Sequence, residues 1–332
     1  MNRRVDRWWY GASRPLWILW PLAWLYRYVA ERRKHKALAT RATGAAFAAP
    51  VIVVGNITAG GTGKSPLTAW LVETLRNEGW RPVILTRGYG GRAEHYPVEV
   101  INGMSANVAG DEPVMLASMT GCPVVVDPKR VRGAAWAIEQ QLGDILVCDD
   151  GLQHYQLPRQ LEIAVFDGER GVGNGAPIPV GPMREPVSRL ATVDFVVFNG
   201  EPKTPLAITH PNLYVMNLQP RALRHLGSGE IRELSWLSGK QVKAVAGIGN
   251  PSRFFNTLNE LGAIVQGNSF PDHYQFRRDD LQVEEGQLLV MTAKDAVKCQ
   301  AFAHDRCWVL EVAATLPQSF REALLLAVKS IN

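Results

Sequence analysis

The residue types in positions 51–66 favour a phosphate-binding loop. In this stretch, VIVVGNITAGGTGKSP, a short apolar, β-branched run leads into a glycine-rich loop, and Lys64 and Ser65 open a segment with helical spacing of apolar residues. Glycines let backbone N–H groups approach phosphate oxygens, and the start of the helix adds the positive end of its dipole. Lys64 would reach the β- and γ-phosphates of a nucleotide, and the Ser65 hydroxyl would bind Mg²⁺.

The loop departs from the usual pattern, in which a glycine lies six residues before the lysine. Thr58 occupies that position. The GG-x-GKS form resembles the loops of MinD/ParA-like nucleotide hydrolases, which carry an extra lysine where this chain has Ala59. A glycine-rich turn that binds nothing is the alternative. We expect ATP to be bound by the whole loop: Thr58, Ala59, Gly60, Gly61, Thr62, Gly63, Lys64 and Ser65.

A second signal is an apolar strand that ends in two carboxylates. Residues 144–151 are DILVCDDG, and strands of this kind hold Mg²⁺ at their carboxyl ends in nucleotide-hydrolysing sheets. We therefore predict Asp149 and Asp150 as metal ligands beside Ser65, with the choice between the two left open. Gln153 and His154 follow directly and would line the same site, although His154 fits an ordinary loop histidine as well.

Two further loops follow predicted strands. In TRGYGG, Arg87 and Tyr89 come after a strand at residues 82–86, and ligands of open parallel sheets bind at such ends. A mobile glycine turn is the alternative. In GDEP, the pattern alone favours Asp111 as a helix N-cap, with Glu112 in the first turn interacting with the helix dipole.

Alternating strands and helices predict the fold class. Apolar strands at residues 51–54, 82–86, 123–127, 161–167 and 194–199 alternate with helical patterns, which indicates mostly parallel sheets with helices on both faces. The pattern restarts near residue 242, which predicts a second α/β unit. A glycine- and proline-rich stretch at residues 168–186 contains Arg184 and Glu185, and its length favours a function. Residues 201–240 carry no clear assignment.

The first 36 residues have the character of an interfacial membrane anchor. Arg3, Arg4 and Arg7 precede an apolar, aromatic run at residues 15–26, and a basic cluster follows at residues 31–36. As a helix the run would reach about 18 Å, short of the roughly 30 Å hydrocarbon core, and tryptophans flanked by basic residues suit the headgroup region. A helix packed on the protein's own core and a secretory signal peptide are the alternatives, and the position of the basic cluster argues against the latter.

Composition describes a globular protein with an anionic partner. Of 332 residues, 46% are hydrophobic and 20% charged, and the net charge is +5. Nucleic acid, anionic lipid and a phosphorylated substrate are all compatible with that charge, but much of it flanks the apolar anchor, so we expect no nucleic-acid partner. Four cysteines without CxxC spacing indicate reduced core residues and argue against a zinc site.

Taken together, these motifs resemble one family over nearly the whole chain. The anchor is followed, in order, by GNITAGGTGKSP, TRGYGG, GDEP, DDGLQH, GPMREP, GIGNPSRFF, FPDHY and TAKDAVK. The combination is similar to the tetraacyldisaccharide 4′-kinases, the lipid A 4′-kinases of Gram-negative bacteria. Departures are small: Ser65 stands where threonine is commoner, and Ala293 where glutamate is frequent.

The resemblance implies a P-loop NTPase-like α/β/α sandwich, a second, smaller α/β lobe and an N-terminal membrane-associated helix. We assign residues 1–36 to the anchoring helix, 37–155 to the nucleotide-binding lobe, and 156–332 to the second lobe, whose last helix could pack back on the first. It also implies a monomeric kinase on the cytoplasmic face of the inner membrane. ATP with Mg²⁺ would phosphorylate the 4′-hydroxyl of tetraacyldisaccharide 1-phosphate, giving lipid IVA.

The resemblance replaces the N-cap interpretation of Asp111. It implies that Asp111 and His273, the histidine of FPDHY, act as a catalytic dyad on the acceptor hydroxyl, beside Lys64. The acceptor would be bound by polar side chains of the loops above: Arg87, Tyr89, Glu112, Gln153, His154, Arg184 and Glu185. The competing hypothesis is a MinD/ParA-like ATPase switch tethered to a membrane, which Ala59 argues against.

Overall fold

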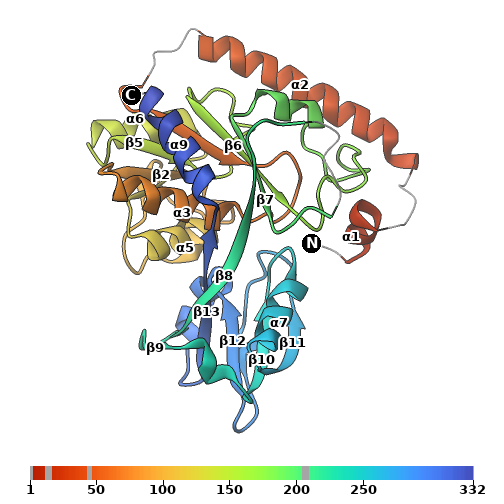
Figure 1. The fold of residues 1–332 in the computed structure, drawn as a ribbon, viewed down its shortest axis with the longest axis vertical. Helices are drawn as coiled ribbons and strands as arrows, with labels where there is room; N and C mark the ends of the chain where they lie inside the picture. Colours follow the sequence, from red (N-terminus) through yellow and green to blue (C-terminus); the bar gives the residue numbers. More distant parts are fainter. Residues whose placement is uncertain (1–2, 12–16, 43–46, 204–208, 332) are drawn as a thin grey trace.

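The computed structural model describes residues 3–11, 17–42, 47–203 and 209–331. Their strands are hydrogen-bonded in the continuous order β11-β10-β12-β13-β8-β7-β6-β1-β5-β2-β4-β3, with β9 paired to β8, and we call the part in each lobe the sheet of that lobe. Figure 1 shows two lobes, the larger above, joined by the long strands β8 (Leu213–His225) and β13 (Cys307–Thr315). The predicted fold class, a P-loop-type α/β lobe with a second α/β lobe and an N-terminal helix, is confirmed.

The first lobe is built on a parallel sheet whose strands are buried on both faces. Alternate residues of β1 (Val51–Gly55) point into different cores: Ile52 and Val54 into one, Val51 and Val53 into the other. Helices α3 (Lys64–Asn77), α5 (Asp111–Thr120) and α9 (Gln318–Ser330) cover the first core, and α6 (Arg130–Glu139) covers the second. The remaining elements of this lobe are β2 (Pro82–Thr86), β3 (Val98–Glu99), α4 (Ala106–Ala109), β4 (Val124–Val126), β5 (Ile145–Cys148), β6 (Leu161–Asp167), η2 (Val187–Thr192) and β7 (Phe195–Asn199).

The second lobe has its own sheet and two smaller cores. Strands β10 (Gln241–Ala246), β11 (Ile264–Ser269) and β12 (Leu288–Thr292) are parallel, and β13 pairs antiparallel with β8. Helices α7 (Pro251–Glu260) and α8 (Ala293–Cys299) pack against this sheet, with the short elements β9 (Ile231–Arg232), η3 (Leu234–Leu237), η4 (Arg278–Leu281) and η5 (Gln300–Phe302).

The boundary between the lobes differs from the one predicted after residue 155. Strand β6 pairs parallel with β1, and β7 with β6, so both belong to the first sheet. The crossing lies within β8, which pairs with β7 through residues 213–216 and with β13 from Asn217 onward. A buried apolar strand looks the same in either sheet, so the sequence pattern of β6 and β7 could not assign them. Helix α9 does return to the first lobe, with Phe320 and Leu324 in its core.

The N-terminal segment consists of α1 (Arg3–Tyr10), η1 (Trp17–Leu19) and α2 (Trp20–Ala42), and α2 lies along the outside of the first lobe (Figure 1). Pro21 is in the first turn of α2, where it fits a helix without loss of a hydrogen bond. Part of the predicted apolar run, residues 15 and 16, and the side chains at positions 3 and 4 lie outside the description. Within the described chain, no helix is both long and apolar enough to cross a bilayer.

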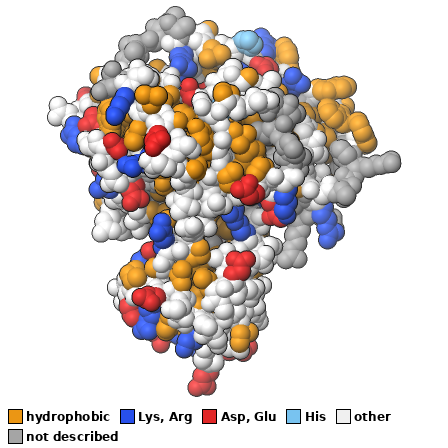
Figure 2. All heavy atoms as spheres, in the orientation of Figure 1, with side chains coloured by type: hydrophobic (Ala, Val, Ile, Leu, Met, Phe, Trp, Pro, Cys, Tyr) orange, Lys and Arg blue, Asp and Glu red, His pale blue; other side chains and the backbone are white. Residues whose placement is uncertain are grey.

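Apolar side chains of this segment are exposed rather than packed. Ile18, Trp17 and Trp24 are 85%, 68% and 64% exposed, and Leu22, Leu25 and Tyr28 are also exposed. Figure 2 shows hydrophobic side chains gathered at the upper right, near the N-terminal part of α2. Ala23 faces the other way and is buried against Ala176 and Val180. Only one side of the segment is therefore used for packing on the lobe.

Candidate active site

The glycine-rich loop connects β1 to α3 in the geometry of a phosphate-binding loop. Gly63 caps α3 with φ of 94°, and Gly60 has φ of 110°, conformations that glycine adopts at little cost. The space at Gly63 is also closed, because a Cβ there would lie 2.5 Å from Nδ2 of Asn199. Asn199, at the end of β7, donates a hydrogen bond to the Thr62 carbonyl at 3.3 Å. A strand end of the sheet thus fixes the loop immediately before Lys64.

The Gly-Pro stretch at residues 168–186 supports the other side of this loop. The backbone N–H of Ala59 donates to Pro182 O at 2.8 Å, and Thr58 forms a β-bridge with Met183. Arg184 donates its own backbone N–H to Ile57 O at 2.7 Å. Arg184 and Glu185 are thereby held beside the phosphate-binding loop, as the length of the stretch suggested.

Lys64, the first residue of α3, lies beside the carboxylates that follow β5. Its Nζ is 3.5 Å from Oδ1 of Asp150 and 3.5 Å from Oδ1 of Asn56, and Arg184 is 3.3 Å from the same Asp150 oxygen. Burial alone would raise the pKa of Asp150, but the charges of Lys64 and Arg184 outweigh it and lower that pKa. Asp150 is therefore an ionised carboxylate that orients two cations.

Asp149 has the environment of a metal ligand. Its Oδ1 accepts a hydrogen bond from Thr68 at 2.9 Å, whereas its buried Oδ2 has no partner in the described part of the chain. Burial, with a further contribution from the Glu112 charge, raises the pKa of Asp149 to about 7 despite the opposing charge of Lys64. A divalent cation at Oδ2 would satisfy this atom and favour the ionised form. Ser65 lies in the first turn of α3. In the described ranges, no three His, Cys, Asp or Glu side chains are grouped so that they could hold a metal ion.

A cleft of about 860 Å³ lies between the lobes and is lined from both sides. The first lobe contributes residues 61–65 and Glu112, and the second lobe contributes Asn250, Asp272 and Lys294. The volume is in the usual range for small-molecule sites. The phosphate-binding loop therefore opens into a space that the second lobe helps to enclose.

Asp111 and His273 meet at this junction although 162 positions separate them. Nδ1 of His273 is 3.1 Å from Oδ2 of Asp111, which is buried. Asp111 is the first residue of α5 and Gly110 is the cap, so the N-cap interpretation was wrong. His273 has φ of 59°, and its ring lies 4.8 Å from that of Tyr89 in TRGYGG. Two loops of the first lobe thus surround one histidine of the second.

A second cavity, of about 1180 Å³, lies between α2 and the first lobe. Its polar lining includes Arg130, Gln153, His154, Arg184 and Glu185, opposite apolar and basic residues of α2. Burial, followed by the charges of Arg130 and Arg87, lowers the pKa of His154 to about 4. A histidine kept neutral among arginines marks a space with positive potential, which suits an anionic ligand.

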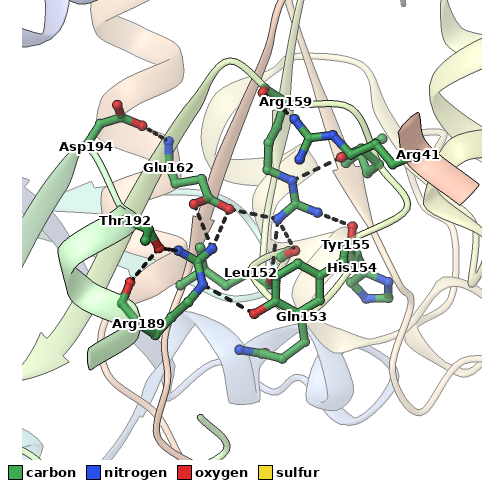
Figure 3. Close-up of polar contacts among 12 residues, drawn as sticks. Arg41, Leu152, Gln153, His154, Tyr155, Arg159, Glu162, Arg189, Thr192 and Asp194 are labelled. Carbon is green, nitrogen blue, oxygen red and sulfur yellow. Dashed lines mark hydrogen bonds and ion pairs between the residues drawn. The ribbon is translucent and has the colours of Figure 1, made fainter. Parts of the chain in front are cut away.

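Behind this cavity, a buried network holds the DDGLQH loop in place (Figure 3). Arg159 donates to the carbonyls of Gly151, Leu152 and Leu157 at 3.0–3.3 Å, and also to that of His154. Glu162 pairs with both Arg159 and Arg189 at 3.1 and 2.6 Å. Gln153 reaches Glu185 at 2.7 Å, and Tyr155 donates to the same carboxylate.

Sequence reasoning missed several residues of the site. Lys294 lies between the lobes, and Asn199 and Arg130 contact the ends of strands. Lys294 is part of the motif TAKDAVK, and Arg130 lies in the first turn of a predicted helix. Neither pattern indicates which residues these side chains contact. The OH of Tyr10 in α1 donates a hydrogen bond to Ala59 O at 3.1 Å, and no sequence pattern indicated that Tyr10 belongs to the site.

The comparisons with known proteins decide the family. A family model described as tetraacyldisaccharide-1-P 4′-kinase matches residues 15–329. The chain belongs to that family. A tetraacyldisaccharide 4′-kinase of Hahella chejuensis is 44% identical over 96% of this chain and 94% of that protein, and one of Nitrosococcus oceani is 42% identical over 97% and 93%. The family resemblance and the kinase prediction are confirmed, and the ATPase-switch alternative is not favoured.

A solved structure supports the same conclusion. The LpxK of Aquifex aeolicus, determined in complex with ATP, superimposes with a TM-score of 0.77 at 26% identity, covering 93% of this chain and 98% of the other. As a kinase of this family, the chain phosphorylates the 4′-position of a tetraacylated disaccharide 1-phosphate, a step of lipid A biosynthesis.

Proposed function

We propose that the cleft between the lobes transfers the γ-phosphoryl group of ATP directly to the 4′-hydroxyl of tetraacyldisaccharide 1-phosphate, giving lipid IVA. The observation that carries this assignment is the Asp111–His273 pair, one residue from each lobe, whose sequence neighbours Glu112 and Asp272 line a cleft that also contains Lys64. In the reaction, the bond between the γ-phosphorus and the bridging oxygen of ADP breaks. A new bond forms to the 4′-oxygen, and its proton leaves to the protein.

The phosphate side of the reaction depends on charge and position. Lys64 and the loop amides stabilise the negative charge of the transferring group, and Asp150 orients Lys64. Ser65 and Asp149 would hold Mg²⁺, which when bound would supply positive charge against the phosphates of the nucleotide. The remaining loop residues, from Thr58 to Gly63, enclose the nucleotide.

His273 is the proposed base for the acceptor hydroxyl. If Nδ1–H donates to Asp111, the lone pair of Nε2 is left to accept the proton of the 4′-hydroxyl. A base positioned in this way contributes about 10²–10⁴-fold to the rate. Asp111 keeps the ring in the required tautomer and favours the imidazolium that forms.

The second cavity is the proposed place for the disaccharide headgroup. Arg130 and Arg184 line this cavity and the charge of Arg87 acts on His154, so the environment is positive and suits the 1-phosphate. Gln153, the neutral His154 and Glu185 offer hydrogen bonds to sugar hydroxyls, and Tyr89, beside the His273 ring, would contact the sugar near the dyad. The apolar residues of α2 that line this cavity, including Leu22 and Leu25, would contact the acyl chains where they extend from the headgroup toward the bilayer. Glu112 contributes through Lys294 rather than by direct contact with the sugar.

The exposed apolar side of the N-terminal segment supports a location at a membrane surface. We propose that it inserts into the cytoplasmic face of the inner membrane, with the monomeric protein resting on the headgroups. The substrate then needs to expose only its sugar to the cleft.

The test is transfer of label from γ-labelled ATP, with Mg²⁺ and the disaccharide 1-phosphate in detergent, to a lipid product. Asp111→Ala and His273→Ala should each lower kcat by about 10²–10⁴-fold. Because the two act as one unit, the double variant should be barely slower than either single variant. Losses that multiply in the double variant would contradict the dyad, and release of phosphate without a labelled lipid would contradict the transfer.

A further inference from the structure

The motif TAKDAVK takes no part in the phosphoryl or proton transfer described so far, yet its lysine lies beside the dyad. Lys294, at the start of α8, places Nζ 3.0 Å from Oε1 of Glu112 and 3.1 Å from Oδ1 of Asp272. Glu112 follows Asp111 in the first lobe, and Asp272 precedes His273 in the second. One ammonium therefore contacts the sequence neighbour of each dyad member.

The contact with Asp272 extends to the backbone of His273. Oδ1 of Asp272 accepts the Lys294 ammonium and also the backbone N–H of His273, at 3.1 Å. That N–H belongs to a residue in the left-handed region, which a non-glycine residue keeps only when its surroundings hold it there. Lys294 thus supports the turn that aims the imidazole at Asp111.

Lys294 is itself held on a rigid base. Thr292 caps α8 by accepting the backbone N–H of Asp295 at 3.2 Å, and the buried Asp295 carboxylate accepts the Gly247 N–H at 3.0 Å. Lys298 pairs with Asp295 at 2.9 Å in the same interior. The first turn of α8 is therefore fixed to β10 and β12. Because Lys294 is held by the sheet of the second lobe, its contact with Glu112 fixes that sheet relative to the first lobe.

We propose that Lys294 is a positioning residue that holds the two lobes in the relative position at which Asp111 and His273 are in contact. Without its charge, Glu112 and Asp272 would face each other as two carboxylates across the junction and would push the lobes apart. With it, both accept bonds from one donor. Although burial alone would raise the pKa of Asp272, the Lys294 ammonium lowers it, and Glu112 and Asp272 together raise the pKa of Lys294 against the effect of burial. Asp272 and Lys294 are therefore charged at neutral pH.

The inference rests on the proposed role of the dyad, so the experiment includes a variant of each. Asp111→Ala establishes that the dyad matters; if it retains full activity, the proposed function fails whatever Lys294 does. Lys294→Met should then lower kcat by about 10–100-fold, since a displacement of about 1 Å costs about 10²-fold, and should leave KM for ATP within about threefold. Lys294→Arg, which keeps the charge, should recover part of the loss.

The decisive variant is Lys294→Met combined with Asp272→Asn. Asparagine keeps an acceptor for the His273 N–H but removes the repulsion with Glu112, so the double variant should be severalfold faster than Lys294→Met alone. Arg321→Met is the matched control: it removes a 2.8 Å ion pair with Glu78, outside the cleft, and should leave kcat unchanged. Hydrogen exchange of residues 270–274 should be faster in Lys294→Met, independent of activity.

Three results would overturn the inference while Asp111→Ala is inactive. The first is an unchanged kcat in Lys294→Met. The second is a loss confined to KM for ATP, which would make Lys294 a phosphate ligand. The third is a double variant no faster than the single one, together with unchanged exchange of residues 270–274.

Discussion

At the scale of single residues, the site depends on side chains whose backbone is unusual. Asp150 and His273 have φ of 50° and 59°, in a region that non-glycine residues rarely adopt. Each is held by neighbours: Asp150 by Lys64 and Arg184, His273 by Asp111 and Asp272. Sequence motifs identified both residues as functional, but a motif does not encode the backbone conformation that brings each side chain to these neighbours.

His154 should give the protein a measurable pH dependence of stability. Its pKa is about 4 in the folded protein against 6.5 for the free side chain, so between these values the unfolded chain binds a proton that the folded protein does not. Stability on this account is intact above pH 6.5 and is lost as the pH falls toward 4, by up to about 3 kcal/mol at about 1.4 kcal/mol per unit. In urea unfolding at pH 7.5 and pH 5, His154→Gln should lose less stability than the wild type on going to pH 5, or should gain more.

The pH dependence of stability must be compared between His154→Gln and the wild type, and not read from one protein alone. The pKa of Asp149 is raised to about 7, and its titration changes stability in the opposite direction over the same pH range. A raised carboxyl pKa means that stability falls as the pH rises through that range. An identical pH dependence in His154→Gln and the wild type would show that His154 is solvated and that the second cavity lacks the positive environment assigned to it.

At the scale of elements, glycines decide how closely the loops approach the dyad. A Cβ at Gly91 would lie 2.5 Å from Gly110 N and 2.6 Å from Val108 O, all backbone atoms that cannot move aside separately. TRGYGG therefore packs directly on the turn that starts α5 with Asp111. Gly91, and Gly88, whose Cβ would lie 2.7 Å from Ala109 O, are therefore required by packing, in addition to any contact with a ligand.

Gly91→Ala should displace the start of α5. We expect a loss of stability larger than about 1 kcal/mol and a fall in kcat of about tenfold or more, because Asp111 would shift relative to His273. Gly90→Ala is the matched control: it has φ of 82° but open space around it, so it should cost about 1 kcal/mol of strain and leave kcat nearly unchanged. Equal kcat values in the two variants would show that the close approach does not position Asp111.

The sequence predicted the regular elements well where their patterns were strong. Buried apolar runs gave β1, β2, β5, β6 and β7 almost to the residue, and the periodic segments gave α3 and α9. It failed for β8, whose exposed residues leave a pattern without clear alternation because the strand spans two sheets with different neighbours. It also failed for β11, an edge strand with exposed, polar positions. Both elements take their structure from tertiary pairing, which a local pattern does not contain.

At the scale of the whole molecule, the active site exists only where the lobes meet. Besides the dyad, Arg170 of the first lobe donates to Gly249 O at 2.6 Å, and Arg253 of the second donates to Oδ1 of Asn199 at 2.9 Å. Asn199 in turn holds the phosphate-binding loop. The motifs could therefore be recognised along the chain, whereas their meeting across 162 positions required the assembled fold.

The last prediction concerns attachment to the membrane. Replacing Trp17, Ile18 and Trp24 by serine removes apolar area from the exposed side, spares the residues that line the second cavity, and leaves the α1 contacts with the first lobe intact. Each buried apolar side chain contributes about 1.5–3 kcal/mol to transfer out of water, so the triple variant should move from the membrane fraction to the soluble fraction. It should also lose activity on substrate in vesicles more than on substrate in detergent, because the cleft is no longer held at the bilayer surface.

The matched control is replacement by serine of three exposed apolar residues elsewhere on the molecule: Ile231, Ile264 and Leu326, which are 57%, 54% and 72% exposed. This triple variant should remain in the membrane fraction like the wild type. Equal partitioning of the two triple variants would contradict the anchor and would leave the exposed side of the N-terminal segment as an ordinary protein surface.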